Sequence, residues 1–118
     1  MDTIDIDKVI SVMDDMDRLI KVVDSKYDPD DDMDPVDSGF MIIRDNLERA
    51  LNSAGAYRIR CFVGDRFDVR IHEAVGTHDL DDFERYEAEF LDDMVYEVVR
   101  SGWKIGNRIR PCQVVVSR

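Results

Sequence analysis

The pattern of hydrophobic and polar residues changes period near the middle of the chain. Apolar residues recur at intervals of three and four over residues 4–54, whereas they alternate with polar residues in much of 56–117. A period near 3.6 is typical of an amphipathic helix, and a period of two is typical of a strand with one buried face. The pattern predicts an α+β chain: a helical hairpin over 1–54, followed by a small, mostly antiparallel β domain over 55–118.

The first helix is expected over residues 4–27. Its apolar seam has spacings of 4, 3, 4, 3 and 4 and consists of Val9, Met13, Met16, Ile20, Val23 and Tyr27. Asp28 ends it, because a residue before proline avoids the helical conformation. The acidic stretch 28–37 lacks the glycine and glutamate that an EF-hand needs at its sixth and twelfth positions, so a solvated loop is favoured over a calcium site.

The second helix is expected over residues 35–54. Asp34 or Asp37 can cap it, Pro35 suits its first turn, and Gly55 suits the position after its end. Its seam continues the spacing of three and four. The hairpin can pack on its own β domain, or two copies can form a four-helix bundle, which the long seams favour. The dimer interface is then expected at Val9, Met13, Met16, Ile20, Val23, Phe40, Ile43, Leu47 and Ala50.

Four strands are expected in the second half. Residues 56–64 and 67–75 alternate, while 94–105 and 108–117 flank Gly106 and Asn107, a two-residue turn signal. The hairpin from Trp103 to Cys112 is the clearest β prediction. Residues 80–90 are compatible with a short amphipathic helix or with a loop.

Charge is distributed unevenly along the chain, whose formal net charge is −11. Residues 1–37 hold 13 acidic and 4 basic residues, and 79–93 hold 8 acidic residues against Arg85, whereas 56–78 and 94–118 together hold 4 acidic and 9 basic residues. The acidic total argues against nucleic acid or an anionic membrane as a partner. No apolar run approaches the ~20 residues of a membrane span, and no secretory signal is evident, so a cytoplasmic location is expected.

Residues with catalytic or metal-binding chemistry do not form a recognisable motif. His72 and His78 are six apart, roughly 120° off a common helix face, so the two-histidine zinc helix of metalloproteases is disfavoured, although a metal-dependent hydrolase stays a minor alternative. No glycine-rich phosphate loop precedes a helix, and no serine has the context of a nucleophile. Buried reduced thiols are favoured for Cys61 and Cys112 over a disulfide or a reactive site. We therefore expect a binding protein with no enzyme activity, metal or cofactor.

Four stretches resemble the GrpE family, the nucleotide exchange factors of DnaK-type chaperones. VISVMDDMDRLIKVVD resembles the first bundle helix, and SGFMIIRDNLERALNSAGAYRI resembles the second bundle helix and the first strand. GDRFDVRIHEAV is similar to the family's G-x-x-F-D-P-x-x-H-E-A-V, and SGWKIGNRIRPCQVVV is similar to G-Y-x-L-x-x-R-x-x-R-P-A-x-V-x-V. The resemblance covers roughly residues 8 to 118, and it implies that His72 belongs to a structural H-E-A-V motif rather than to a metal site.

The resemblance also implies a fold and a function. The family pairs a dimeric helical part with a β domain that grips the chaperone's nucleotide-binding domain, opens its cleft and promotes ADP release. Positions that match the family's contacts are Arg18, Val22, Gly39, Phe67, Val69, Val99, Arg108 and Val116. Phe67, Val99 and Val116 could instead be core residues, Arg108 could be a solvated hairpin residue, and Arg18 could pair with Asp14 within its helix.

The chain departs from the family pattern in several places. The family's long N-terminal helix is nearly absent, Val69 stands in place of the usual proline, and Cys112 stands in place of alanine. The last hairpin is one residue shorter, and the segment 76–94 looks longer than usual. These departures leave open a GrpE-derived dimeric adaptor or regulator that has lost productive exchange.

Overall fold

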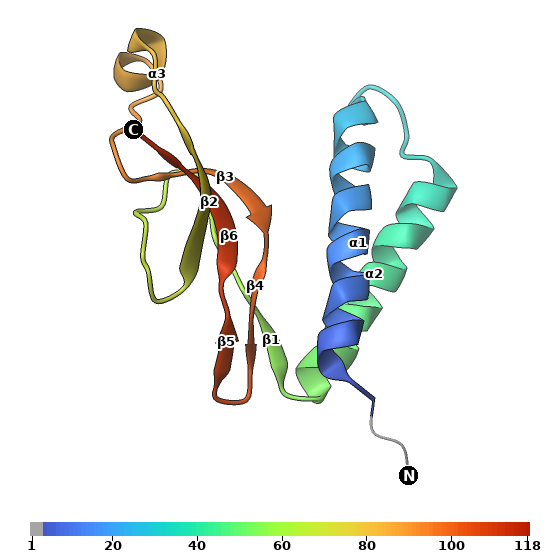
Figure 1. Cartoon of the computed structure of the whole chain (residues 1–118). Coiled ribbons are helices and arrows are strands. Elements are labelled where there is room, and N and C mark those ends of the chain that lie inside the picture. Colours follow the sequence, from blue (N-terminus) through green and yellow to red (C-terminus); the bar gives the residue numbers. More distant parts are fainter. Residues whose placement is uncertain (1–3) are drawn as a thin grey trace. The chain divides into compact units, whose positions relative to one another are not determined.

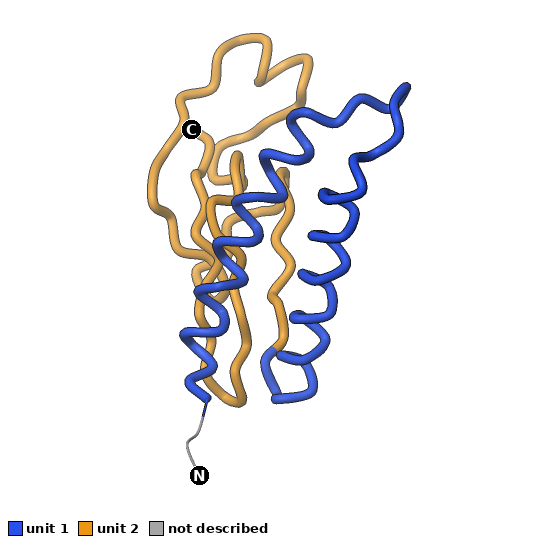
Figure 2. The backbone as a smooth tube through the Cα atoms, turned by 90° about the vertical axis from the view of Figure 1, so that its right-hand side faces the viewer, with its two compact units in different colours: residues 1–56 blue, residues 57–118 orange. Residues whose placement is uncertain are grey.

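The computed structural model describes residues 4–118 and divides them into two compact units. The first ends at Ala56, and the second runs from Tyr57 to Arg118 (Figure 2). Helices dominate the first unit and strands the second, so the predicted α+β class is confirmed.

Two capped helices make up the first unit. Helix α1 (Ile6–Lys26) begins after Asp5, whose carboxylate accepts the Asp7 amide at 3.0 Å. Helix α2 (Pro35–Ser53) begins after Asp34, whose carboxylate accepts the Val36 amide at 2.7 Å. Gly55, with φ of +90°, follows the α2 cap in the left-handed conformation that favours glycine. The capping and turn residues in the sequence thus predicted each helix end to within two residues of its observed position.

Two cross-helix ion pairs define how α1 and α2 face one another. Arg44 Nε lies 2.9 Å from Asp17 Oδ1, and Lys26 Nζ lies 3.1 Å from Asp37 Oδ2. Because the helices are antiparallel, seven residues back along α1 and seven forward along α2 bring Ile10 opposite Leu51. Both side chains are buried, with 1% and 3% of their surface exposed. The hairpin therefore has buried apolar residues on both helices at this level, with the Asp17–Arg44 ion pair half-buried and Lys26 exposed farther along.

Two three-stranded sheets make up the second unit (Figure 1). The order of the first is β1 (Ala56–Ile59), β4 (Gly102–Ile105) and β5 (Arg108–Arg110). In the second, β6 (Cys112–Ser117) lies between β2 (His72–His78) and β3 (Val95–Arg100). Strand β6 is antiparallel to β3 but parallel to β2, and β4 and β5 form the predicted antiparallel hairpin.

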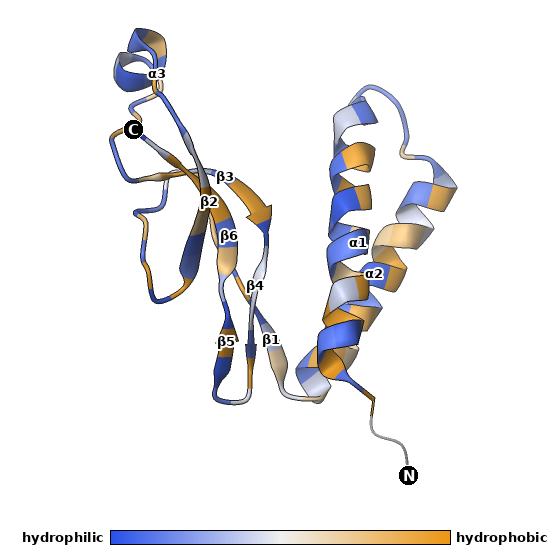
Figure 3. Ribbon diagram, viewed as in Figure 1, coloured by the Kyte–Doolittle hydropathy of each residue, from blue (hydrophilic) through white to orange (hydrophobic). Residues whose placement is uncertain are grey.

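The core of this unit lies along β6 and β3, which Figure 3 draws with extended apolar segments. Val95, Cys112, Val114 and Val116 form the buried cluster. Four partly buried side chains pack against it: Ile59, Cys61, Phe67 and Val98. Alternate residues of β6 thus enter the core, as expected for a strand whose pattern has a period of two.

All four of the expected strands have the wrong bounds. The first ends at Ile59, because Phe62 and Asp65 close a turn in which the Phe62 amide donates to the Asp65 carboxylate at 2.9 Å. The strand expected over 67–75 begins only at His72. The strand expected over 94–105 is broken at Ser101, and its two parts, β3 and β4, join different sheets. The strand expected over 108–117 is broken at Pro111, which has no amide hydrogen to donate, and its two parts join different sheets.

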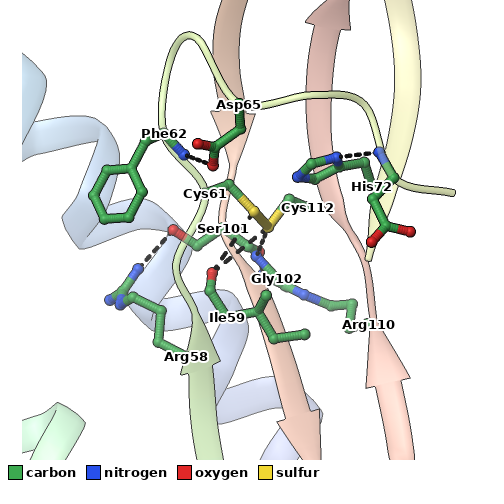
Figure 4. Close-up of a disulfide and its surroundings, with 11 residues drawn as sticks. Arg58, Ile59, Cys61, Phe62, Asp65, His72, Ser101, Gly102, Arg110 and Cys112 are labelled. Carbon is green, nitrogen blue, oxygen red and sulfur yellow. Dashed lines mark hydrogen bonds between the residues drawn. A yellow bond between two sulfur atoms is a disulfide. The ribbon is translucent and has the colours of Figure 1, made fainter. Parts of the chain in front are cut away.

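The prediction of reduced thiols is also wrong, since Cys61 and Cys112 form a disulfide with Cα atoms 6.9 Å apart (Figure 4). Cys61 follows β1 and Cys112 begins β6, so the bond links the chain after the first sheet to the central strand of the second. Gly102 permits this approach, because a Cβ there would lie 2.8 Å from both the Arg110 carbonyl oxygen and the Cys112 nitrogen. The spacing of 51 residues in sequence carried no information about this proximity.

Among residues 4–118, no helix combines the length and the hydropathy that a membrane span requires.

Candidate functional site

A tightly held loop precedes β2 and carries two of the predicted contact residues, Phe67 and Val69. The buried His72 ring accepts the Asp68 amide at Nδ1 over 2.9 Å, and the His72 amide donates to the Asp68 carbonyl at 2.7 Å. These bonds support the interpretation of H-E-A-V as a structural motif.

The carboxylate of Asp68 stiffens the same loop through Arg70. Nε and Nη2 of Arg70 donate to the two carboxylate oxygens at 3.0 and 2.9 Å. These hydrogen bonds to Arg70 are the main cause that lowers the pKa of Asp68 to about 2. Val69 lies between these two residues in the sequence, and 79% of its surface is exposed. The loop therefore holds an apolar side chain toward solvent on a constrained backbone.

The two histidines lie at opposite ends of β2 and have different partners. A strand rises about 3.3 Å per residue, so the six steps from His72 to His78 separate them by roughly 20 Å. His78 Nε2 lies 3.0 Å from Glu84 Oε1, far from the loop that His72 holds. One metal ion cannot bind both side chains in this arrangement.

The predicted contact residues of the β unit divide into exposed and buried groups. Val99 is 41% exposed on β3, an edge strand, where the pairing register with β6 shifts between Val98 and Arg100. Arg108 is exposed at the start of β5. Phe67 packs on the core cluster, and Val116 belongs to it with only 8% exposure. Val69, Val99 and Arg108 are therefore accessible, whereas Val116 lies in the core and Phe67 packs against it.

The predicted contact residues of the helical unit are Arg18, Val22 and Gly39. Arg18 and Val22 are four residues apart on α1 and therefore share a face; the Arg18 side chain is 71% and Val22 57% exposed. Arg18 Nη2 forms an ion pair with Asp15 at 2.6 Å, while Arg18 Nε donates to the Asp14 carbonyl at 3.5 Å. Asp14 is therefore a partner of Arg18 within the helix, but through its backbone. Gly39 is half-buried on α2, and a Cβ there would meet nothing within 4 Å.

Cationic side chains brace the turn between β3 and β4, next to the disulfide. Arg58 Nη1 donates to Ser101 Oγ at 2.8 Å, and Arg110 Nη2 donates to the Ser101 carbonyl at 2.7 Å (Figure 4). The Arg58 guanidinium also lies 4.9 Å from the centroid of the buried Trp103 ring. These contacts hold the chain between the edge strand that carries Val99 and the hairpin that carries Arg108.

Sequence reasoning missed a polar cluster around Glu84. The carboxylate contacts His78 through Oε1 and accepts the Tyr96 hydroxyl through Oε2, while the His78 and Tyr96 rings stack with centroids 3.8 Å apart. The available signal was the capping box of Asp81 and Glu84 at the start of α3 (Asp82–Tyr86). That signal predicts a helix start but not its long-range partners.

The sequence model of the GrpE family matches residues 5–118. The chain belongs to the GrpE family. The match includes both units and all eight predicted contact residues. It agrees with the order of elements, in which a capped helix pair precedes the loop and the hairpin that carry the two most specific motifs.

Curated GrpE proteins from distant organisms are similar to this family member over nearly its whole length. Protein GrpE of Chlorobium phaeobacteroides is 28% identical over 112 residues, which cover 94% of this chain and 55% of that protein. Protein GrpE of Limosilactobacillus reuteri is 29% identical, with coverages of 93% and 53%, and that of Halobacterium salinarum is 26% identical, with coverages of 95% and 46%. The chain spans about half the length of the curated relatives it matches.

Proposed function

We propose that this GrpE-family protein is a nucleotide exchange factor. It binds the nucleotide-binding domain of a DnaK-type chaperone, holds its cleft open and promotes release of ADP. The observation that carries the proposal is the family match over residues 5–118, which includes both motifs. Val69 and Arg108 are exposed within these motifs, and Val99 is exposed just before the second one.

Exchange of this kind requires no bond chemistry. If a protein binds only the open form of a nucleotide cleft, it weakens ADP binding by the same factor by which ADP weakens its own binding. The surface must therefore match one conformation of its partner, and it must not deform when it binds. The Asp68–Arg70 pair and the Ser101 contacts supply that rigidity on the β unit.

The proposed contact combines apolar side chains with a cation. Val69 and Val99 supply apolar area, and Arg108 supplies charge that can pair with an acidic patch on the chaperone. Phe67 and Val116 contribute only indirectly, through the core of the β unit. Arg18, Val22 and Gly39 provide a further contact from the helical unit.

Release of a fluorescent ADP analogue from a DnaK-type chaperone tests this proposal. We expect Val99→Asp to weaken binding at least tenfold and Arg108→Ala about fivefold, because central apolar and arginine contacts contribute most to such interfaces. Val75→Asp is the matched control for the first variant, since Val75 is 48% exposed on the opposite edge strand β2. Lys104→Ala on the neighbouring strand β4 is the control for the second.

The same assay separates exchange from simple binding. Acceleration of ADP release by substoichiometric protein supports the exchange factor. Binding without acceleration supports the alternative, a dimeric adaptor or regulator derived from GrpE. Unchanged affinity in both site variants would refute the assignment of Val99 and Arg108.

We also propose that the helical unit forms a homodimer through apolar positions that the hairpin leaves exposed. Val36 and Ile43 on α2 are 78% and 58% exposed, and with exposed Ala50 they follow a seven-residue spacing. On α1, Val12 and Leu19 are about half exposed with the same spacing. A seven-residue repeat of exposed apolar side chains is the seam that a helical bundle buries. Of the interface residues predicted from sequence, Met13 and Val23 are buried, while Val9, Met16, Ile20, Phe40 and Leu47 are half-buried.

A further inference from the structure

The connection between β2 and β3, residues 79–93, is held rigidly at one end of the β unit. It contains α3, and its Leu80 amide donates to the Arg118 carbonyl at 2.8 Å while its Asp93 amide donates to the Ser117 carbonyl at 2.8 Å. These bonds tie the two ends of the connection to Ser117, the last residue of β6, and to Arg118, which follows it. Figure 1 shows α3 at the opposite end of this unit from the β4–β5 hairpin.

Glu84 fixes the orientation of α3. Its carboxylate binds His78 and the Tyr96 hydroxyl, and its side chain caps the helix by accepting the Asp81 amide at 3.3 Å. The ring of Phe90 lies 5.3 Å from that of Tyr96, and Arg85 pairs with Asp92 at 3.0 Å. Anchoring is therefore achieved by polar groups and by Phe90.

Three other apolar side chains of the connection take no part in this anchoring. Phe83 is 68%, Tyr86 78% and Leu91 62% exposed. Phe83 and Tyr86 are three residues apart and share a face of α3, whereas Glu84 lies roughly 130° around the helix axis from the middle of that face. A segment that is held in place by several hydrogen bonds thus exposes two aromatic rings to water.

The charges around these rings restrict what can bind them. The connection carries 8 acidic residues against Arg85, a net charge of −7. Such a surface repels phosphate groups, which excludes nucleic acid and anionic lipid, and it attracts cations. Exposed aromatic side chains on a preordered backbone are the features that anchor protein–protein contacts, because little entropy is lost when they are buried.

We propose that Phe83, Tyr86 and Leu91 form a docking surface for a cationic segment of a partner polypeptide, with aliphatic or aromatic side chains among its lysines and arginines. The rings bury the apolar side chains, and the acidic residues around them pair with the cations. Because α3 and the β4–β5 hairpin lie at opposite ends of the β unit, occupation of this surface leaves Arg108 accessible. The surface is therefore additional to the proposed chaperone contact, and its existence does not depend on exchange activity.

Fluorescence anisotropy with a short labelled peptide that repeats lysine, leucine, leucine and arginine tests the proposal. We expect the Phe83→Ser/Tyr86→Ser variant of the full chain to bind this peptide at least tenfold more weakly than the wild type. Phe62→Ser is the matched control, since Phe62 is 62% exposed on a loop of the same unit outside the connection, and it should bind as the wild type does. Unchanged Trp103 emission shows that each variant is folded.

A second variant separates the charges from the rings. Glu87→Lys/Glu89→Lys keeps both aromatic side chains and adds cations near the C-terminal end of α3, where their interaction with the helix dipole is favourable. We expect it to weaken binding several-fold, and we expect a peptide with serine in place of leucine to bind poorly to every variant. Equal affinity of the wild type and Phe83→Ser/Tyr86→Ser would overturn the proposal, as would binding of RNA or phosphatidylglycerol vesicles through these residues.

Discussion

Reduction of the Cys61–Cys112 disulfide should destabilise the β unit while leaving its sequence unchanged. The bond joins residues 51 apart, and a cross-link over a loop of this length removes chain entropy equivalent to roughly 4 kcal/mol from the unfolded state at 25 °C. The effect acts mainly on the unfolded chain, because the reduced side chains can keep their places in the core. The prediction therefore tests whether the chain after β1 meets the start of β6 as the structure shows.

The size of this effect is large relative to the stability of the unit. The unit runs from residue 57 to 118, and at about 0.1 kcal/mol per residue its free energy of unfolding is roughly 6 kcal/mol. Reduction would leave roughly 2 kcal/mol and raise the unfolded fraction about a thousandfold. With a urea dependence of about 1 kcal/mol per molar, the midpoint should fall by roughly 4 M.

Trp103 provides the assay, because it is the single tryptophan of the chain and is fully buried in β4. Urea unfolding followed by its emission should show a large difference between the oxidised protein and the protein kept in a phosphine reductant. The Cys61→Ala/Cys112→Ala variant is the control, since its curve should not respond to the reductant. Overlapping curves for the oxidised and reduced wild type, or two titratable thiols in the unreduced protein, would refute the reasoning.

Two further predictions concern Glu84 and the helical unit. The Tyr96 hydroxyl, and then His78, lower the pKa of Glu84 from 4.5 to about 2, so its contribution to stability is complete above pH 4.5 and is lost as the pH falls toward 2. Glu84→Gln should flatten the acid dependence of amide-exchange protection in α3 across that window, and an unchanged profile would contradict the role of the carboxylate. In the helical unit, Ile43→Asp should shift sedimentation equilibrium toward monomer by at least tenfold in dissociation constant, because it places a charge in the proposed seam. Val75→Asp in the β unit should sediment as the wild type does, and equal dissociation constants for Ile43→Asp and the wild type would remove Ile43 from the interface.

The sequence determined the local elements of this protein because their signals lie within a few neighbouring residues. Asp34, Pro35 and Gly55 define the ends of α2, and Gly106 with Asn107 defines the β4–β5 turn. These residues act through their own backbone angles and through hydrogen bonds to near neighbours. The two motifs around His72 and Trp103 likewise sufficed to suggest the family.

Tertiary structure alone decided which distant segments meet. The break at Pro111 assigns β5 and β6 to different sheets, and that arrangement brings Cys112 to Cys61 and buries Val116, a residue predicted to be a contact. The local pattern of 80–90 was compatible with a short amphipathic helix or with a loop, and it could not show that Phe83 on α3 would be exposed. The spacing of apolar residues shows that a helix or strand has an apolar face. Only the packing of the whole chain determines whether that face is covered, because the residues that cover it are distant in the sequence.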